Sequence, residues 1–144
     1  MTFSSASAVT AYLSGGKGGP AGALTACLAN PTTRNSSGDF GTQVTAFKLN
    51  VDFNTAGLMP RGVTTAYSSL IVCATGFTSI DGHTVAQVLG LAETALGGGG
   101  LPPGMAYSDV SAIAADLNLS FDDNGTQFCP STWANAHLFF NSCP

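Results

Sequence analysis

The pattern of apolar positions is clearest between residues 84 and 100. One stripe at spacings of three and four predicts an amphipathic helix, and it consists of Val85, Val88, Leu89, Ala92 and Leu96. Thr84 and Gln87 have the spacing of a capping box, in which each side chain accepts the other residue's backbone N–H. The glycines from Gly97 to Gly100 favour a left-handed cap. The segment therefore predicts a helix with one buried face.

A second amphipathic stripe follows this glycine-rich loop. It predicts a helix that starts at Ser108, with Asp109 in the first turn, where the helix dipole favours a carboxylate. The inner face of this helix would carry Val110, Ile113, Ala114, Leu117 and Phe121. Because the connection is short, the two helices are expected to pack as an antiparallel pair.

Residues 40–53 fit two periods. Helical spacing places four apolar side chains on one face, namely Phe40, Val44, Phe47 and Val51. Strand alternation selects a different set, namely Phe47, Leu49, Val51 and Phe53. We favour a helix for the first half, with an extended end as the alternative.

The remaining elements are expected to be short. Residues 4–13 predict a helix capped by Ser4 or Ser5, and the Gly-rich and Pro-containing run 15–20 ends it. Residues 1–14 would then be a detachable N-terminal segment, with 15–20 as its linker. Residues 21–29 suit either helix or strand. Residues 70–73 predict a buried strand, and residues 131–140 a last short helix.

Together these elements predict one domain over residues 1–144. Its fold class is mainly α, a small helical domain with short strand segments, and α+β is the alternative. A chain of 144 residues that is 44% hydrophobic is long enough for one packed core.

Charge is scarce in this chain. Only 8% of the residues are Asp, Glu, Lys or Arg, against about 25% in typical proteins. The net charge is −4, and the basic side chains are scattered at Lys17, Arg34, Lys48 and Arg61. Nucleic acids and anionic membrane surfaces attract clustered basic residues, so neither is an expected partner. No segment has the ~20 apolar residues that span a bilayer.

Four cysteines accompany this weak charge. An even number of cysteines and a neutral surface favour disulfide bonds and a location outside the reducing cytosol. Four cysteines allow three pairings, and proximity in the sequence favours Cys27 with Cys73 and Cys129 with Cys143. Four buried thiols in a cytosolic protein are the alternative. No signal peptide is visible at residues 1–5, so an exported protein would begin here at a mature fragment.

The candidate catalytic and metal-binding residues are few. His83 and His137 are the only histidines, and neither has metal-ligand spacing to another His or Cys. A triad of nucleophile, base and orienting residue cannot be assigned from the sequence. An aromatic platform for glycans would use Trp133 and Tyr107, with Trp133 as a core anchor the preferred interpretation.

Oxygen ligands are densest between residues 116 and 124. The cluster comprises Asp116, Asn118, Asp122, Asp123 and Asn124. It lacks the central glycine and closing glutamate of a calcium loop, so a helix end followed by a turn is the preferred interpretation. Calcium remains the alternative, and no cofactor is expected. Three asparagines, Asn35, Asn118 and Asn124, match the glycosylation pattern.

Four stretches together resemble a module of large bacterial surface and secreted proteins. They are TFSSASAVTAYL at 2–13, FGTQVTAFKLNVDF at 40–53, HTVAQVLGLA at 83–92 and YSDVSAIAADLN at 107–118. The resemblance covers most of the chain in the same order. It implies an extracellular location, and it implies no activity and no catalytic residues, because the module is uncharacterised.

These observations favour a non-enzymatic extracellular module with a structural or adhesive role, for example as the repeating subunit of a surface assembly or filament. Weak surface charge lowers the repulsion between copies, so the expected partners are further copies of this chain or other surface proteins. The N-terminal segment would detach and dock on a neighbour. A glycan- or ligand-binding domain is the alternative, and a secreted hydrolase ranks third.

Overall fold

The computed structural model describes residues 1–15, 18–32, 35–58, 66–120 and 131–144. Its helices are α1 (Ala6–Ser14), α2 (Gly38–Thr55), α3 (Val85–Leu96), α4 (Tyr107–Leu119) and α5 (Thr132–His137), with a single 3-10 turn η1 (Tyr67–Ser69). The strands β1 (Ile71–Val72) and β2 (Leu138–Phe139) form one small sheet. The protein is therefore mainly α, as the sequence predicts.

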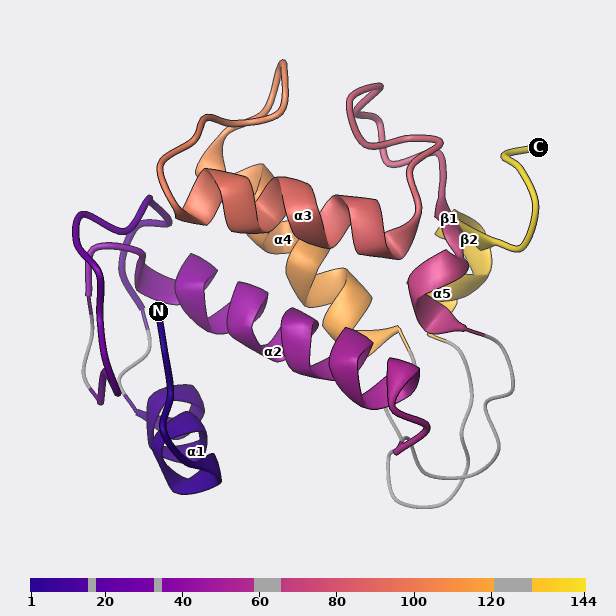
Figure 1. Ribbon diagram of the computed structural model, residues 1–144. Coiled ribbons are helices and arrows are strands. Elements are labelled where there is room, and N and C mark those ends of the chain that lie inside the picture. The colour runs from indigo at the N-terminus through magenta and orange to yellow at the C-terminus, as the bar shows by residue number, and fades with distance from the viewer. Residues whose placement is uncertain (16–17, 33–34, 59–65, 121–130) are drawn as a thin grey trace.

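Helices α2, α3 and α4 form the body of the molecule (Figure 1). α3 lies beside α2, and α4 returns behind α3 in the opposite direction, which confirms the antiparallel pair. One cluster of buried apolar side chains fills the space between them and extends to η1 and β1. None of the helices in the described ranges is long and apolar enough to cross a membrane.

α2 is helical along its whole length. Its buried face carries Phe40, Val44, Phe47 and Val51, the set that helical spacing predicts. Leu49 is only half-buried and Phe53 is 47% exposed, so the extended end is wrong. The reason is that α4 and α3 cover one side of α2, and only a period of 3.6 keeps all four side chains on that side.

The ends of α3 and α4 follow their local sequence. Thr84 accepts a hydrogen bond from the Gln87 backbone N–H, and the Gln87 side chain accepts one from Thr84 N–H, so the capping box is confirmed. Gly98, with φ +82°, supplies the left-handed residue after α3. α4 starts at Tyr107, one residue earlier than predicted, and Asp109 accepts a hydrogen bond from the Ala106 N–H.

The last element differs from its prediction. Instead of a helix over residues 131–140, α5 ends at His137 and β2 follows at once. β2 pairs with β1 in antiparallel register, with Ile71 opposite Phe139 and Val72 opposite Leu138. The predicted strand at residues 70–73 is confirmed in its central two residues. It draws residues 138 and 139 out of the helix because its free edge offers backbone partners.

Residues 1–14 form an arm at one end of the molecule, below the N-terminal part of α2 in Figure 1. Ser5 caps α1, and Thr2 forms a parallel bridge with Ala29, the one residue of 21–29 that is bridged. Tyr12 is the only buried residue of α1. Its hydroxyl is the one buried side-chain polar atom in the described ranges that has no hydrogen-bond partner. The arm is therefore docked on its own body through few buried groups, and its detachment stays a prediction.

Candidate functional site

The C-terminal tail, residues 131–144, is tied to the body by a disulfide bond. Cys73 pairs with Cys143 across 70 residues, with Cα atoms 5.5 Å apart. Both predicted pairings are therefore wrong for these two cysteines. Cys27 is an exposed free thiol, and Cys129 lies outside the described residues.

Sheet pairing explains this disulfide. Cys73 directly follows β1, and Cys143 lies four residues after β2. Cys73 N–H also donates to the His137 carbonyl oxygen at 2.9 Å, which holds the two segments together next to the bond. Proximity in sequence misleads here because strand pairing brings together segments that are far apart along the chain.

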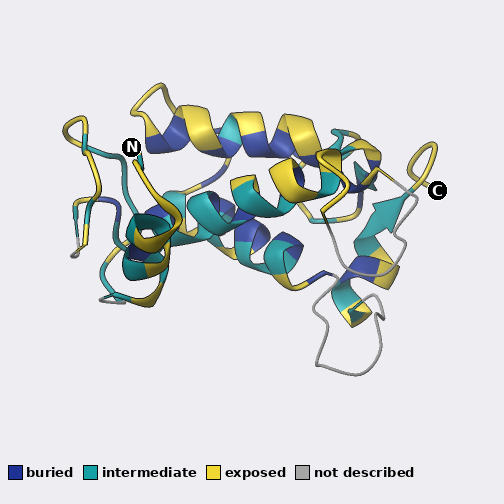
Figure 2. Ribbon diagram, turned by 60° about the horizontal axis from the view of Figure 1, so that its bottom comes forward, coloured by how far each residue is buried: buried dark blue, intermediate teal, exposed yellow. Residues whose placement is uncertain are grey.

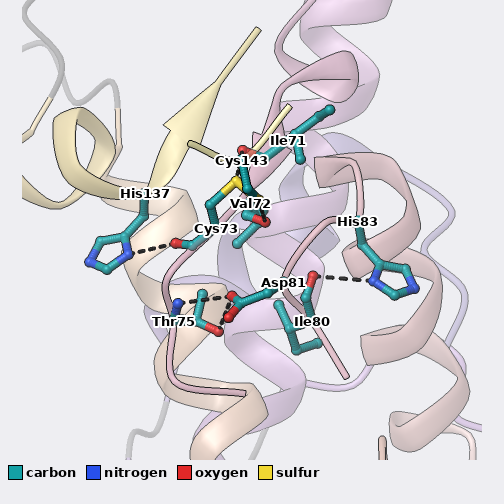
Figure 3. The surroundings of a disulfide bond; sticks show 9 residues. All are labelled: Ile71, Val72, Cys73, Thr75, Ile80, Asp81, His83, His137 and Cys143. Atoms are coloured by element: carbon teal, nitrogen blue, oxygen red, sulfur yellow. Dashed lines mark hydrogen bonds between the residues drawn. A yellow bond between two sulfur atoms is a disulfide. The ribbon is translucent and has the colours of Figure 1, made fainter. Parts of the chain in front are cut away.

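His137 lies beside this disulfide (Figure 3). Its Nδ1 is hydrogen-bonded to the Cys73 carbonyl oxygen at 2.8 Å. Its ring stacks on Trp133 with centroids 4.7 Å apart. Burial raises the pKa of the Asp116 carboxyl, and the nearby His137 opposes that shift. These contacts fix the His137 ring between Trp133 of the tail and the backbone of Cys73 in the body.

The second histidine occupies the other side of the same loop. His83 Nδ1 is within 3.2 Å of the Ile80 carbonyl oxygen. Asp81 accepts hydrogen bonds from the backbone N–H and the hydroxyl of Thr75, at 2.8 and 2.7 Å (Figure 3). Both imidazoles thus bind backbone oxygens through Nδ1. In the described ranges neither makes the hydrogen bond to a carboxylate that a nucleophilic triad requires.

The oxygen-rich segment 116–124 is only partly described. Asp122, Asp123 and Asn124 lie outside the described residues, so the calcium alternative cannot be placed there. Asn118 binds α2 instead: its amide donates to the backbone oxygen and Oε1 of Gln43, and its oxygen accepts from Asn50. No group of three potential metal ligands occurs among the described residues. These bonds also engage the amide that N-glycosylation would modify.

Trp133 and Tyr107 do not form one platform. Tyr107 is the first residue of α4 and its ring contacts Phe40, with centroids 5.7 Å apart. Trp133 lies in α5, which is joined to the other end of α4 by a hydrogen bond from Ser131 N–H to the Ser120 oxygen. The 13 residues of α4 separate these ends by about 18 Å. Both rings pack partly buried against the core, as a core anchor would.

Sequence reasoning missed a cavity between the arm and the body. It has a volume of about 330 Å³ and is partly open to solvent. Its apolar wall consists of Met1, Phe3 and Val9 from the arm, Leu24, Val44 and Leu49, and Leu96 at the end of α3. The apolar residues of the N-terminal segment were visible in the sequence, but the segment's position on α2 was not.

Backbone contacts fix the walls of this cavity in place. Leu24 N–H donates to the Leu96 carbonyl oxygen at 2.8 Å. The bridge between Thr2 and Ala29 fixes the strand-like start of the arm, next to Phe3. At the rim Lys48 forms an ion pair with Asp52 at 3.1 Å, and Glu93 is exposed. The volume is at the lower end of the ~300–1,000 Å³ typical of binding pockets.

Comparison with known proteins gives no relative for this chain. No family model matches it, and neither the curated proteins nor the solved structures that were searched contain a match. The geometry of the tail and of the cavity therefore carries what is proposed below.

Proposed function

We propose that this protein is a non-enzymatic extracellular module with a structural or adhesive role, which associates with further copies of itself. The observation that carries the proposal is the Cys73–Cys143 disulfide in a chain with only 8% charged residues. Disulfides of this kind persist in oxidising compartments. A neutral surface of Thr, Ser, Asn and Gly lets identical copies approach without strong repulsion.

We expect the arm to take part in this self-association. It carries a half-buried apolar set at one end of the molecule, and glycines join it to the body. A Δ2–13 variant is expected to remain a folded monomer and to lose assembly. Helix content from circular dichroism and sedimentation velocity over a concentration series measure the two effects. Undiminished assembly of this variant would rule out the arm's role.

Two measurements on the unmodified protein test the proposal as a whole. Thiol counting under denaturing, non-reducing conditions is expected to find the Cys73 and Cys143 thiols blocked. Sedimentation velocity is expected to show species larger than one chain as concentration rises. A protein with all four thiols free and a single monomeric species at every concentration would contradict the proposal.

The cavity supports a second candidate, a ligand-binding domain. Apolar walls with a few polar groups at the rim are typical of small-molecule sites. Saturable binding of a hydrophobic fluorescent probe by the monomer, lost on replacing Leu49 with Trp and retained on replacing Trp133 with Ala, would favour this candidate. If Trp133→Ala lost glycan binding with an unchanged melting temperature, this result would instead favour a glycan site at Trp133.

A further inference from the structure

Two apolar features of the monomer lie at opposite ends of the molecule. One is the cavity between the arm and the body, next to the N-terminus. The other is Phe140, which follows β2 near the C-terminus and is 70% exposed, the highest value among the large apolar side chains described. Figures 1 and 2 both show the N- and C-terminal ends far apart across the helical body. Phe140 therefore cannot enter the cavity of its own chain.

The tail presents Phe140 on a closed loop. Phe139, the residue before it, is paired with Ile71 in the sheet. Cys143, three residues after it, is bonded to Cys73 in the body. A side chain held at both flanks loses little conformational freedom on binding, so an exposed aromatic here is suited to act as an anchor.

The cavity suits an aromatic side chain in size and polarity. A cavity of ~150 Å³ lined by Leu, Ile and Phe holds one benzene ring. The 330 Å³ here has room for a phenyl ring together with part of its backbone. Residues 139–144 carry no charged side chain, so their entry would bury no unpaired charge from the tail. Asn141 and Ser142 follow Phe140 and offer hydrogen bonds to a rim that carries Lys48, Asp52 and Glu93.

We propose that Phe140 of one copy inserts into the arm–body cavity of the next, so that copies join head to tail. The proposal rests on the self-association proposed above and names its contact. Because the two surfaces differ, the interface is heterologous and leaves one free Phe140 and one free cavity at the ends of every open oligomer. Such contacts produce open filaments or closed rings instead of a symmetric dimer. The arm stays in place, where Phe3 and Val9 form part of the cavity wall.

Complementation between two variants tests this contact in the full chain. Phe140→Ser removes the anchor, and Leu49→Trp fills the cavity from α2. Both are made in a Cys27→Ser/Cys129→Ser background, so that no disulfide can join two chains through these cysteines. Each variant alone is expected to be monomeric, with its affinity for itself weakened at least about tenfold. A 1:1 mixture is expected to form species of two chains and nothing larger, because only one intact pair of surfaces remains.

Matched variants control for general effects. Leu58→Ser removes a side chain that is 69% exposed and lies in neither surface, so it is expected to assemble like the unmodified protein. Phe140→Tyr keeps the ring and is expected to retain assembly. Val9→Trp fills the cavity from the arm and replaces Leu49→Trp if that variant unfolds. Circular dichroism confirms that each variant is folded.

The outcomes separate this contact from self-association itself. If the unmodified protein assembles and Phe140→Ser assembles equally well, the contact is overturned while the proposed function stands. Equal losses in Leu58→Ser and Phe140→Ser, or a folded 1:1 mixture that stays monomeric, overturn it too. An unmodified protein that is monomeric at every concentration removes the proposed function and this contact with it.

Discussion

The helical body and the C-terminal tail differ in what holds them in place. In the body, Phe40 and Phe47 are fully buried and α3 contributes six more buried side chains. In the tail only Ala134 is buried, and Trp133 and Leu138 are partly covered. The tail depends instead on two strand residues, on backbone bonds to Cys73 and on the disulfide. The covalent bond thus attaches a region that buries fewer apolar side chains than the body.

Removal of a core ring in the body has the largest expected effect. Phe47→Ala should lower the free energy of unfolding by about 3–5 kcal/mol, because a fully buried ring leaves a cavity between α2 and α4. Urea unfolding followed by circular dichroism measures it. Phe53→Ala, on the same helix and 47% exposed, should cost less than about 1 kcal/mol. Similar losses for both would show that the body is not held by this face.

Removal of the disulfide tests the tail. The double variant Cys73→Ser/Cys143→Ser opens a 70-residue loop and is expected to cost about 2–4 kcal/mol, with the helices retained. Hydrogen exchange should show faster exchange at residues 71–73 and 138–139 than in α3. Unchanged exchange at the sheet would mean that β1 and β2 hold the tail without the covalent bond.

A pH titration tests one buried hydroxyl of the body. Tyr67 donates a hydrogen bond to the Leu117 carbonyl oxygen at 2.7 Å, and burial raises the pKa of its hydroxyl. The unfolded chain would ionise this group near pH 10 while the folded chain keeps it neutral. Stability is therefore retained below about pH 10 and falls as the pH rises further.

Tyr67→Phe is the matched variant for this titration. It should cost about 1–2 kcal/mol at pH 7, because the buried Leu117 oxygen loses the hydrogen bond from the hydroxyl and keeps only the longer one from Ser120 N–H. It should also reduce the loss of stability between about pH 10 and pH 11, measured by thermal unfolding. If both proteins lose the same amount of stability at alkaline pH, groups other than Tyr67 cause the loss.

Loss of a helix cap should give the smallest effects. It extends the comparison from the body to the arm at the other end of the molecule. Thr84→Ala removes the cap of α3 and should cost about 1 kcal/mol of global stability. Ser5→Ala removes the equivalent cap of α1. Because the arm buries only Tyr12, this loss should appear as local fraying of α1 by hydrogen exchange and not in global unfolding. Equal global losses would show that the arm unfolds together with the body.

The sequence predicted the body better than the ends. The faces of α2, α3 and α4 follow from apolar spacing, because residues three and four apart meet on one side of a helix. The α3 cap also follows from neighbouring residues, Thr84 and Gln87. The sequence left the end of α2 undecided, because strand alternation at Leu49 and Phe53 competes there with helical spacing. Only packing against α4 decides between the two patterns.

The candidate sites were predicted less well than the helical body. No local pattern connects Cys73 to Cys143, and sequence proximity gave the wrong partners. Trp133 and Tyr107 are both aromatic, but α4 holds them at opposite ends. The cavity needs Phe3, Leu49 and Leu96 to meet, three residues from three separate segments. Such sites depend on contacts between segments, which spacing along the chain does not encode.

By itself, the sequence determined the mainly helical class, the core faces of three helices and the weak charge of the surface. These depend on composition and on interactions within one or two helical turns. The tertiary structure alone decided the disulfide partner, the end of α5, the position of the arm and the cavity beneath it. Each of these joins segments distant in sequence, and their positions become defined only when the core packs and the backbone groups at its edges find partners.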